Sequence, residues 1–305
     1  MLATIPVLLI VAVLVFLMLR LTPGDPAAIL AGDAASSEQI AAIRSSLGLD
    51  RSIPVQFAIW FGHLLQGDLG QSYFYKMPVA QLIGQRLEPT LALASLTIAF
   101  AVLVAVPLGV VAAWRFGGWF DRVLMGFSVL GFSIPVFVLA YILIWIVSLK
   151  LGWLPVQGYV RISENFLLCI KHLILPSITL SVIYIALIAR LTRASVLEAL
   201  GEDYIRTARA KGLPEMRVLM RHALANAAVP IVTVIGIGIA VLIGGVVVTE
   251  SVYAIPGLGR LTVDAVLARD FPTVQAVILF FSFVYVFVNL LIDLSYVFLD
   301  PRIRY

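Results

Sequence analysis

Six long runs without Asp, Glu, Lys or Arg constrain this chain more than any other feature of its sequence. They cover residues 1–19, 89–114, 123–149, 172–189, 222–249 and 271–292. A helix needs about 20 residues to cross about 30 Å of hydrocarbon. Within lipid the backbone must satisfy its own hydrogen bonds, and none of the runs alternates in polarity, so we expect helices and not strands. The sequence predicts an all-α polytopic membrane protein with six transmembrane helices.

Composition supports the same class. Of the 305 residues, 62% are hydrophobic and 12% are charged, whereas a soluble domain carries about 25% charged residues. The formal net charge of +4 is therefore attributed to Lys and Arg on the cytoplasmic side and not to nucleic-acid binding. The single cysteine, Cys169, excludes an internal disulfide and a cysteine metal site, and no metal site is expected. Neither a basic segment nor a cleavage site flanks the first run, so we expect an uncleaved span.

The predicted organisation has a long external loop after the first helix and a helical cytoplasmic loop between the fourth and fifth. The segments are a first transmembrane helix at 1–21, an external loop at 22–88, a five-helix core at 89–299 with spans at about 89–114, 123–149, 172–190, 229–250 and 273–297, a cytoplasmic loop at 193–227, and a cytoplasmic tail at 300–305.

Orientation follows from the distribution of Lys and Arg among the short loops. Segments 115–122, 190–221 and 300–305 together carry eleven, whereas the opposite short loops carry five. We therefore expect both termini to be cytoplasmic and segment 22–88 to lie outside.

The external segment contains local structure signals. A turn is expected at 23–26, and a short helix at 36–47 capped by Ser36 or Ser37. Residues 54–66 are apolar and aromatic and are expected along the membrane surface. The glycines at 67 and 70 are expected to interrupt regular secondary structure there.

Two predicted spans carry small residues at every fourth position, which places them on one helix face. The set is Ala101, Ala105, Gly109 and Ala113 in the second span and Gly236, Ala240 and Gly244 in the fifth. This face could serve packing within the bundle, or it could form a seam of the pathway or a subunit interface. Pro107 and Pro135 are expected to kink their helices.

The cytoplasmic segment 193–230 reads as two short helices joined by a hinge. The first is expected at about 195–211, with Gly212 at its C′ position and Pro214 in the first turn of the next helix. Small Ala208 and Gly212 would let a partner approach closely. From the residues alone, the segment is either a solvated loop that sets topology or a docking element.

A resemblance bears on that choice. Residues 203–212 read Asp-Tyr-Ile-Arg-Thr-Ala-Arg-Ala-Lys-Gly, which resembles the cytoplasmic coupling loop of type I ABC importer permeases in the oligopeptide, dipeptide, glutathione and nickel branch. The match to the broader pattern of such permeases is partial, since Arg206 stands where they have Glu. Further segments fit the branch in order, at 23–26, 47–50, 67–70, 256–261, 269–272 and 289–304.

The resemblance implies a subunit of a bacterial inner-membrane importer, with a second permease, two ATP-binding subunits, an extracytoplasmic solute-binding protein and membrane lipid as partners. This chain would bind no cofactor, because it lacks a phosphate-binding loop; ATP and Mg would belong to the partner subunits. The residues implied in coupling to the ATPase are Glu202, Asp203, Tyr204, Arg206, Thr207, Ala208, Arg209 and Gly212.

The expected function is to form half of the pathway for a peptide-like solute, and no catalytic residue is expected. A nickel-chelate permease of the same branch and a secondary transporter are the alternatives. Glu250 and Asp293 lie at or inside span ends, where a charge is costly, so each has either a structural pairing role or a role in the pathway or gate.

Overall fold

A computed structural model describes residues 4–21, 26–31, 35–46 and 48–299 of the chain. The predicted tail at 300–305 and most of the predicted turn at 23–26 lie outside these ranges. The described residues contain helices and one isolated β-bridge between Gln71 and Pro78, but no strand. The all-α prediction is confirmed.

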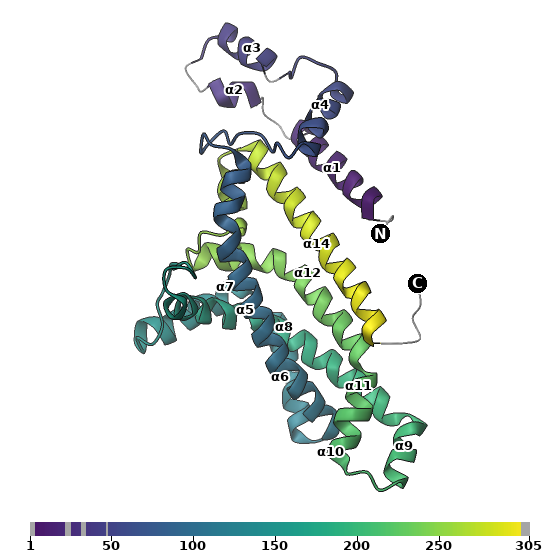
Figure 1. The fold of residues 1–305 in the computed structure, drawn as a ribbon. Coiled ribbons are helices and arrows are strands. Elements are labelled where there is room, and N and C mark those ends of the chain that lie inside the picture. Colours follow the sequence, from purple (N-terminus) through teal and green to yellow (C-terminus); the bar gives the residue numbers. More distant parts are fainter. Residues whose placement is uncertain (1–3, 22–25, 32–34, 47, 300–305) are drawn as a thin grey trace. The chain divides into compact units, whose positions relative to one another are not determined.

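The chain divides into two compact units, of which unit 1 comprises residues 1–88 and 260–286. Its helices are α1 (Thr4–Leu21), α2 (Pro26–Ala31), α3 (Ser37–Ser46), α4 (Ile53–Leu65), the start of α5 (Val79–Trp114), most of α13 (Leu258–Leu267) and the first half of α14 (Phe271–Leu299) (Figure 1).

Two of the expected local signals in unit 1 are present, the cap of α3 and the break after α4. Ser36 caps α3: its hydroxyl accepts from the Gln39 backbone N–H at 3.3 Å, and the Gln39 side chain accepts from the Ser36 N–H at 2.9 Å. This reciprocal pair satisfies two N–H groups that the helix leaves without partners. The turn that ends α4 contains Gly67 and Gly70, whose φ values of 79° and 78° favour glycine.

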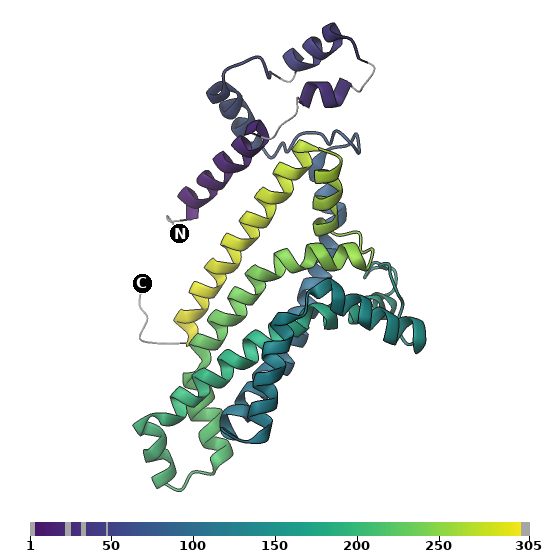
Figure 2. The ribbon, with the colours of Figure 1, turned by 180° about the vertical axis from the view of Figure 1, so that it is seen from behind.

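Unit 2 comprises residues 89–259 and 287–305. Besides the remainder of α5 and α14, it contains α6 (Trp119–Ser133), α7 (Val136–Leu143), η1 (Ile144–Lys150), α8 (Phe166–Gly201), α9 (Asp203–Ala210), α10 (Glu215–Arg217), η2 (Val218–Ala223), α11 (Leu224–Asn226) and α12 (Ala228–Val252) (Figure 2).

Four helices among the described residues, α5, α8, α12 and α14, are long and apolar enough to cross a membrane. A fifth arises if α6 and the segment 136–150 count as one span, although they are bent by 103°. The bend falls where expected, at Pro135, because proline offers no N–H to the preceding turn and pushes Ile134 to an extended ψ of 120°. Pro107, by contrast, lies inside the continuous helix α5.

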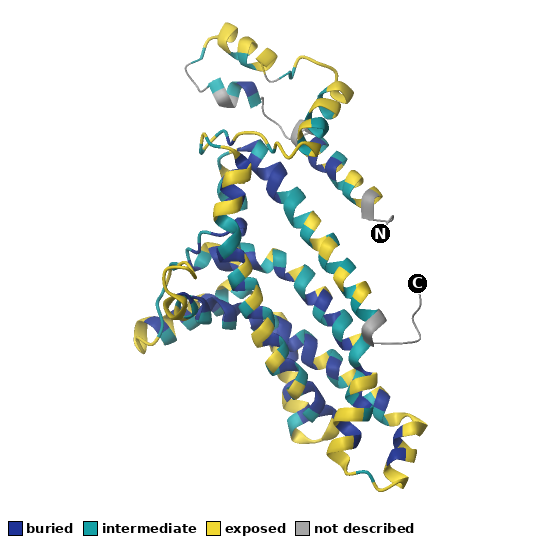
Figure 3. Ribbon diagram, viewed as in Figure 1, coloured by how far each residue is buried: buried dark blue, intermediate teal, exposed yellow. Residues whose placement is uncertain are grey.

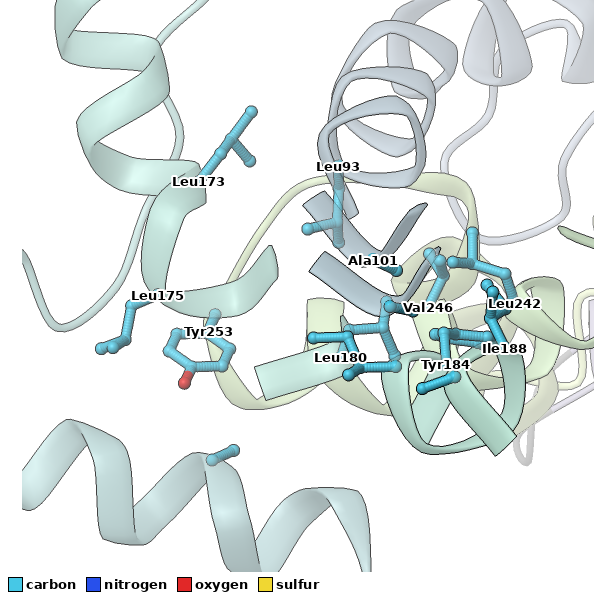
Figure 4. Packing of buried hydrophobic residues seen from close by; sticks show 14 of the residues in the cluster. Leu93, Ala101, Leu173, Leu175, Leu180, Tyr184, Ile188, Leu242, Val246 and Tyr253 are labelled. Atoms are coloured by element: carbon cyan, nitrogen blue, oxygen red, sulfur yellow. The ribbon is translucent and has the colours of Figure 1, made fainter. Parts of the chain in front are cut away.

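α8 is the central helix of unit 2 and packs against α6, α7 and α12. Tyr184, Leu180 and Ile188 of α8 meet Leu242 and Val246 of α12 in the buried cluster shown in Figure 4. The burial of this apolar surface stabilises unit 2.

The small-residue stripe of α5 serves this packing. Ala101 and Ala105 are fully buried, and a Cβ at Gly109 would lie 2.6 Å from the Ala189 carbonyl oxygen of α8. The stripe of α12 is divided: Gly236 packs against Ile292 of α14, Ala240 is half-buried, and Gly244 is exposed with open space around it.

Candidate functional site

The predicted coupling segment contains one helix break that the sequence analysis did not place. Instead of one helix at 195–211, α8 continues to Gly201, Glu202 adopts an extended ψ of 150°, and α9 begins at Asp203. The extended backbone of Glu202 interrupts the helical hydrogen bonding and lets α9 start as a separate helix. α9 lies at one end of unit 2 together with α10 and η2 (Figure 1).

α9 is strongly amphipathic, and the described part of the chain covers only one of its faces (Figure 3). Ile205 and Ala208 point into a small buried cluster with Val196, Val218 and Leu219. The exposed residues of the predicted coupling set are Glu202, Asp203, Tyr204, Arg206, Thr207, Arg209 and Gly212. The structure therefore presents seven of the eight predicted coupling residues on the surface.

Ala208 is the exception, with 7% of its surface exposed. We expected its small size to admit a partner, but the side chain faces the chain's own cluster. The reason is its spacing of three residues from Ile205, which places both on the inward face of α9. A small residue at 208 thus serves contact within the segment.

The turn after α9 is closed by local contacts. Gly212 has a φ of 76° with nothing within 4 Å of a Cβ position, so glycine is needed for its backbone conformation and not for space. The Leu213 N–H donates to the Ala208 carbonyl at 3.3 Å, and Arg209 pairs with Glu215 of α10 at 2.8 Å. These contacts confirm Gly212 at the C′ position.

Tyr204 is the aromatic residue on the exposed side of α9. Partial burial, together with the neighbouring Glu202 carboxylate, raises the pKa of its phenol above the ordinary value of 10.0, while a hydrogen bond with Asn226 acts in the opposite direction. The phenol is therefore a neutral group at physiological pH.

An ion pair that the sequence analysis did not foresee ties α6 to α8 near this segment. Arg193 donates to both carboxylate oxygens of Asp121: its Nη2 lies 2.8 Å from Oδ2, and its Nε contacts Oδ1. The Asp121 Oδ2 also accepts from the Gly117 N–H at 3.0 Å. The side chains are only 17% and 5% exposed. Because 72 residues separate the two, no sequence spacing could have indicated the pair.

Glu250, one of the two predicted gate residues, is fully buried at the end of α12. Its Oε1 accepts from the Thr90 hydroxyl at 2.6 Å, and the Thr90 oxygen accepts from the Leu258 N–H at 2.8 Å. Cβ atoms at Gly257 and Gly259 would lie 2.1 and 3.0 Å from the Glu250 carboxylate. The carboxylate is thus enclosed by α5, the turn at 253–257 and the start of α13.

Asp293, the second predicted gate residue, is exposed on α14. No described residue makes a hydrogen bond or an ion pair with its carboxylate. Its neighbour Ile292 packs against Gly236, which precedes Glu250 by 14 residues or about 21 Å of helix. The structure therefore places the two predicted gate residues near opposite ends of α12 and does not bring them together.

No group of three His, Cys, Asp or Glu side chains that could hold a metal ion occurs in the described part of the chain.

Comparison with known proteins identifies the family. The profile described as binding-protein-dependent transport system inner membrane component matches residues 105–305, and the profile of the corresponding N-terminal region matches residues 1–94. The probable peptide ABC transporter permease protein y4tP of Sinorhizobium fredii is 54% identical over 99% of this chain and 97% of its own length. The glutathione transport system permease protein GsiC of Pectobacterium atrosepticum is 47% identical over 100% of this chain and 97% of its own length.

The fold has a counterpart among solved structures. A chain of the inward-facing MetNI methionine ABC transporter matches with a TM-score of 0.61 and 19% identity, covering 72% of this chain and 97% of that one. The family profiles span nearly all of the sequence, and the expected class of protein is confirmed. The chain belongs to the binding-protein-dependent transport system inner membrane components, the permease subunits of ABC importers, which are not themselves enzymes.

Proposed function

We propose that this chain forms half of the translocation pathway of an ATP-driven importer for a peptide-like solute, and that α9 is the element that receives the movement of an ATPase subunit. The observation that carries the proposal is the exposure of seven predicted coupling residues, five of them on the short, well-anchored helix α9 and the other two flanking it. In this arrangement α9 and both termini lie in the cytoplasm. The partners are a second permease, two ATP-binding subunits that carry ATP and Mg, and an extracytoplasmic solute-binding protein.

The anchoring of α9 supports a mechanical role. Its inner face is buried through Ile205 and Ala208, and its C-terminal turn is held by the Arg209–Glu215 pair. A helix fixed in this way can pass a displacement to α8 and η2 as a rigid body. Differential contacts of the exposed face with two arrangements of the ATPase would shift the permease between discrete states.

The ion pair between Asp121 and Arg193 extends this connection. It joins the first turn of α6 to α8, so movement of α8 near the coupling segment is transmitted to α6. A bidentate, mostly buried pair is well suited to this because its geometry is restrictive.

The solute class is supported by the relatives, one named as a peptide transporter permease and another as a glutathione transport permease. Glutathione is itself a small peptide, so both names point to the same class. We therefore propose a dipeptide, an oligopeptide or glutathione as the solute.

The proposal is tested by reversing a charge on the exposed face of α9. In Arg206→Glu, whose native side chain is 79% exposed, we expect at least about tenfold lower ATP-driven peptide uptake by the reconstituted importer, with the chain still folded. Arg161→Glu, also an exposed charge reversal, is the matched control and should keep wild-type uptake. Full uptake and full ATPase retention in Arg206→Glu would contradict the role of α9.

A further inference from the structure

A cavity of about 460 Å³ opens in unit 1, and the coupling residues lie elsewhere. Its walls come from α1, the end of α3, α4, the turn after α4 and the first residues of α14. Cavities of about 300–1,000 Å³ with a few polar groups are typical of small-molecule sites. The cavity thus has the size of a ligand site, and its polar groups indicate which ligand it would take.

Arg51 lines the cavity, and no residue in the described part of the chain neutralises its charge. No described residue makes a hydrogen bond or an ion pair with the guanidinium. The guanidinium has a planar set of donors that matches a carboxylate. Arg51 is therefore available to a carboxylate that enters the cavity.

The same cavity contains a carboxylate. Asp68 Oδ2 lies 3.2 Å from His63 Nδ1, and Asp68 Oδ1 accepts from the Gly70 N–H at 2.9 Å. These contacts hold the side chain in place, yet 59% of it remains exposed. Asp68 can therefore accept a further donor.

Gln56 lines the cavity with a side-chain amide of fixed orientation. Its Nε2 donates to the Arg51 and Leu49 carbonyls at 2.7 and 3.3 Å, which defines the amide direction. Its Oε1 is then left buried with no hydrogen-bond partner among the described residues. This oxygen has almost no accessible surface, so a molecule in the cavity would contact Arg51 and Asp68 and not Gln56 Oε1.

The walls are preformed. Trp60 packs against Phe16 and Phe57 with ring centroids 5.5 and 6.0 Å apart. Tyr73, which also lines the cavity, is held by its backbone N–H, which donates to the buried Asp270 Oδ1 at 2.9 Å. Preformed walls reduce the entropy that binding must overcome.

We propose that this cavity binds a short peptide with both termini free. The peptide carboxylate would pair with Arg51 and its ammonium group with Asp68. A simple anion would meet the Asp68 charge and a simple cation the Arg51 charge, whereas a zwitterion satisfies both. The inference rests on the proposed peptide-like solute and adds a receiving site for it.

The test is direct titration of the purified complex with L-alanyl-L-leucine, without nucleotide and without binding protein, in nanodiscs that contain phosphatidylglycerol as the only lipid. We expect saturable binding, and at least tenfold weaker binding of the N-acetylated, C-amidated dipeptide. Arg51→Gln and Asp68→Asn should each weaken binding about tenfold. Arg44→Gln removes an exposed charge nearby and should change nothing. A binding-induced fluorescence change should vanish in Trp60→Phe.

Several results would overturn the site. They are no binding by the wild type, equal binding of the blocked peptide, or an Arg51→Gln affinity equal to that of Arg44→Gln. A phosphatidylethanolamine head group is also zwitterionic, so the titration is repeated with this lipid. Unchanged peptide affinity supports the peptide assignment, and tenfold weakening assigns the cavity to the lipid instead. ATP-driven uptake by the same complex separates the two proposals: intact uptake without cavity binding overturns only the site, whereas absent uptake contradicts the importer function.

Discussion

The Thr90 hydroxyl donates to the buried Glu250 carboxylate at 2.6 Å while its oxygen accepts from the Leu258 N–H at 2.8 Å. One hydroxyl thus connects α5, the end of α12 and the start of α13, which follows the turn after α12. The arrangement depends on glycine at 257, because a Cβ there would overlap the carboxylate. The turn at 253–257 therefore leads into Leu258, which is held by Thr90 and Glu250, so a shift of the start of α13 would break these bonds.

The first prediction concerns that overlap. Gly257→Ala should lower the stability of unit 2 by about 1–3 kcal/mol, because a buried carboxylate must shift to admit the methyl group. Gly244→Ala is the matched control: it has nothing within 4 Å of the new methyl group and should stay within about 0.5 kcal/mol of the wild type. Thermal unfolding of the purified chain in detergent measures both. Equal midpoints for the two variants would refute the positioning role of Glu250.

A second prediction concerns Asp121 and Arg193. Asp121→Ala should cost about 3–5 kcal/mol, because it leaves the mostly buried guanidinium without its partner. The exposed pair of Asp203 and Arg206 is the comparison, since Asp203→Ala removes a carboxylate that is 93% exposed and should cost less than about 1 kcal/mol. Thermal unfolding of the Asp121→Ala and Asp203→Ala variants measures both stability losses. A small effect of Asp121→Ala would show that Arg193 finds another partner.

A third prediction follows from the inward position of Ala208. Ala208→Leu should destabilise the coupling segment by about 1–3 kcal/mol through overpacking against the buried cluster around Ile205. Thr207→Leu places a similar side chain on the exposed face and should leave stability nearly unchanged while reducing coupled uptake. Limited proteolysis of the 203–226 segment distinguishes the two. Equal protection from protease in both variants would mean that position 208 tolerates bulk.

A fourth prediction concerns the buried carboxylate of unit 1. Asp270 accepts from the Tyr73 N–H at 2.9 Å and from the Thr273 hydroxyl at 2.7 Å, and it also contacts the Ser72 hydroxyl. Asp270→Ala should cost about 2–4 kcal/mol, because a buried backbone N–H and two hydroxyls lose a charged acceptor. The exposed Asp50→Ala is the control and should change stability by less than about 0.5 kcal/mol. Hydrogen exchange at the Tyr73 amide reports the effect locally, and unchanged protection there would contradict it.

Several elements could be predicted from the sequence because their signals are local. The apolar helices follow from runs of residues without charge, the cap at Ser36 from a side chain three residues from its partner, and the end of α9 from Gly212. The bend at Pro135 follows from a missing N–H. The predicted coupling residues are nearly contiguous, so a ten-residue motif contains seven of the eight, and their role stays a prediction.

Tertiary structure alone decided the rest, because the contacts join residues far apart in the chain. Asp121 and Arg193, Thr90 and Glu250, and Ser72 and Asp270 are separated by 72, 160 and 198 residues. The direction of Ala208 depends on the break at Glu202, which sets the rotation of α9 against η2. The cavity around Arg51 and Asp68 is lined by residues of α4 and of the start of α14, which are far apart in the chain. Local patterns determine which segments are helical and apolar, whereas packing determines which polar groups become buried and which partners they find.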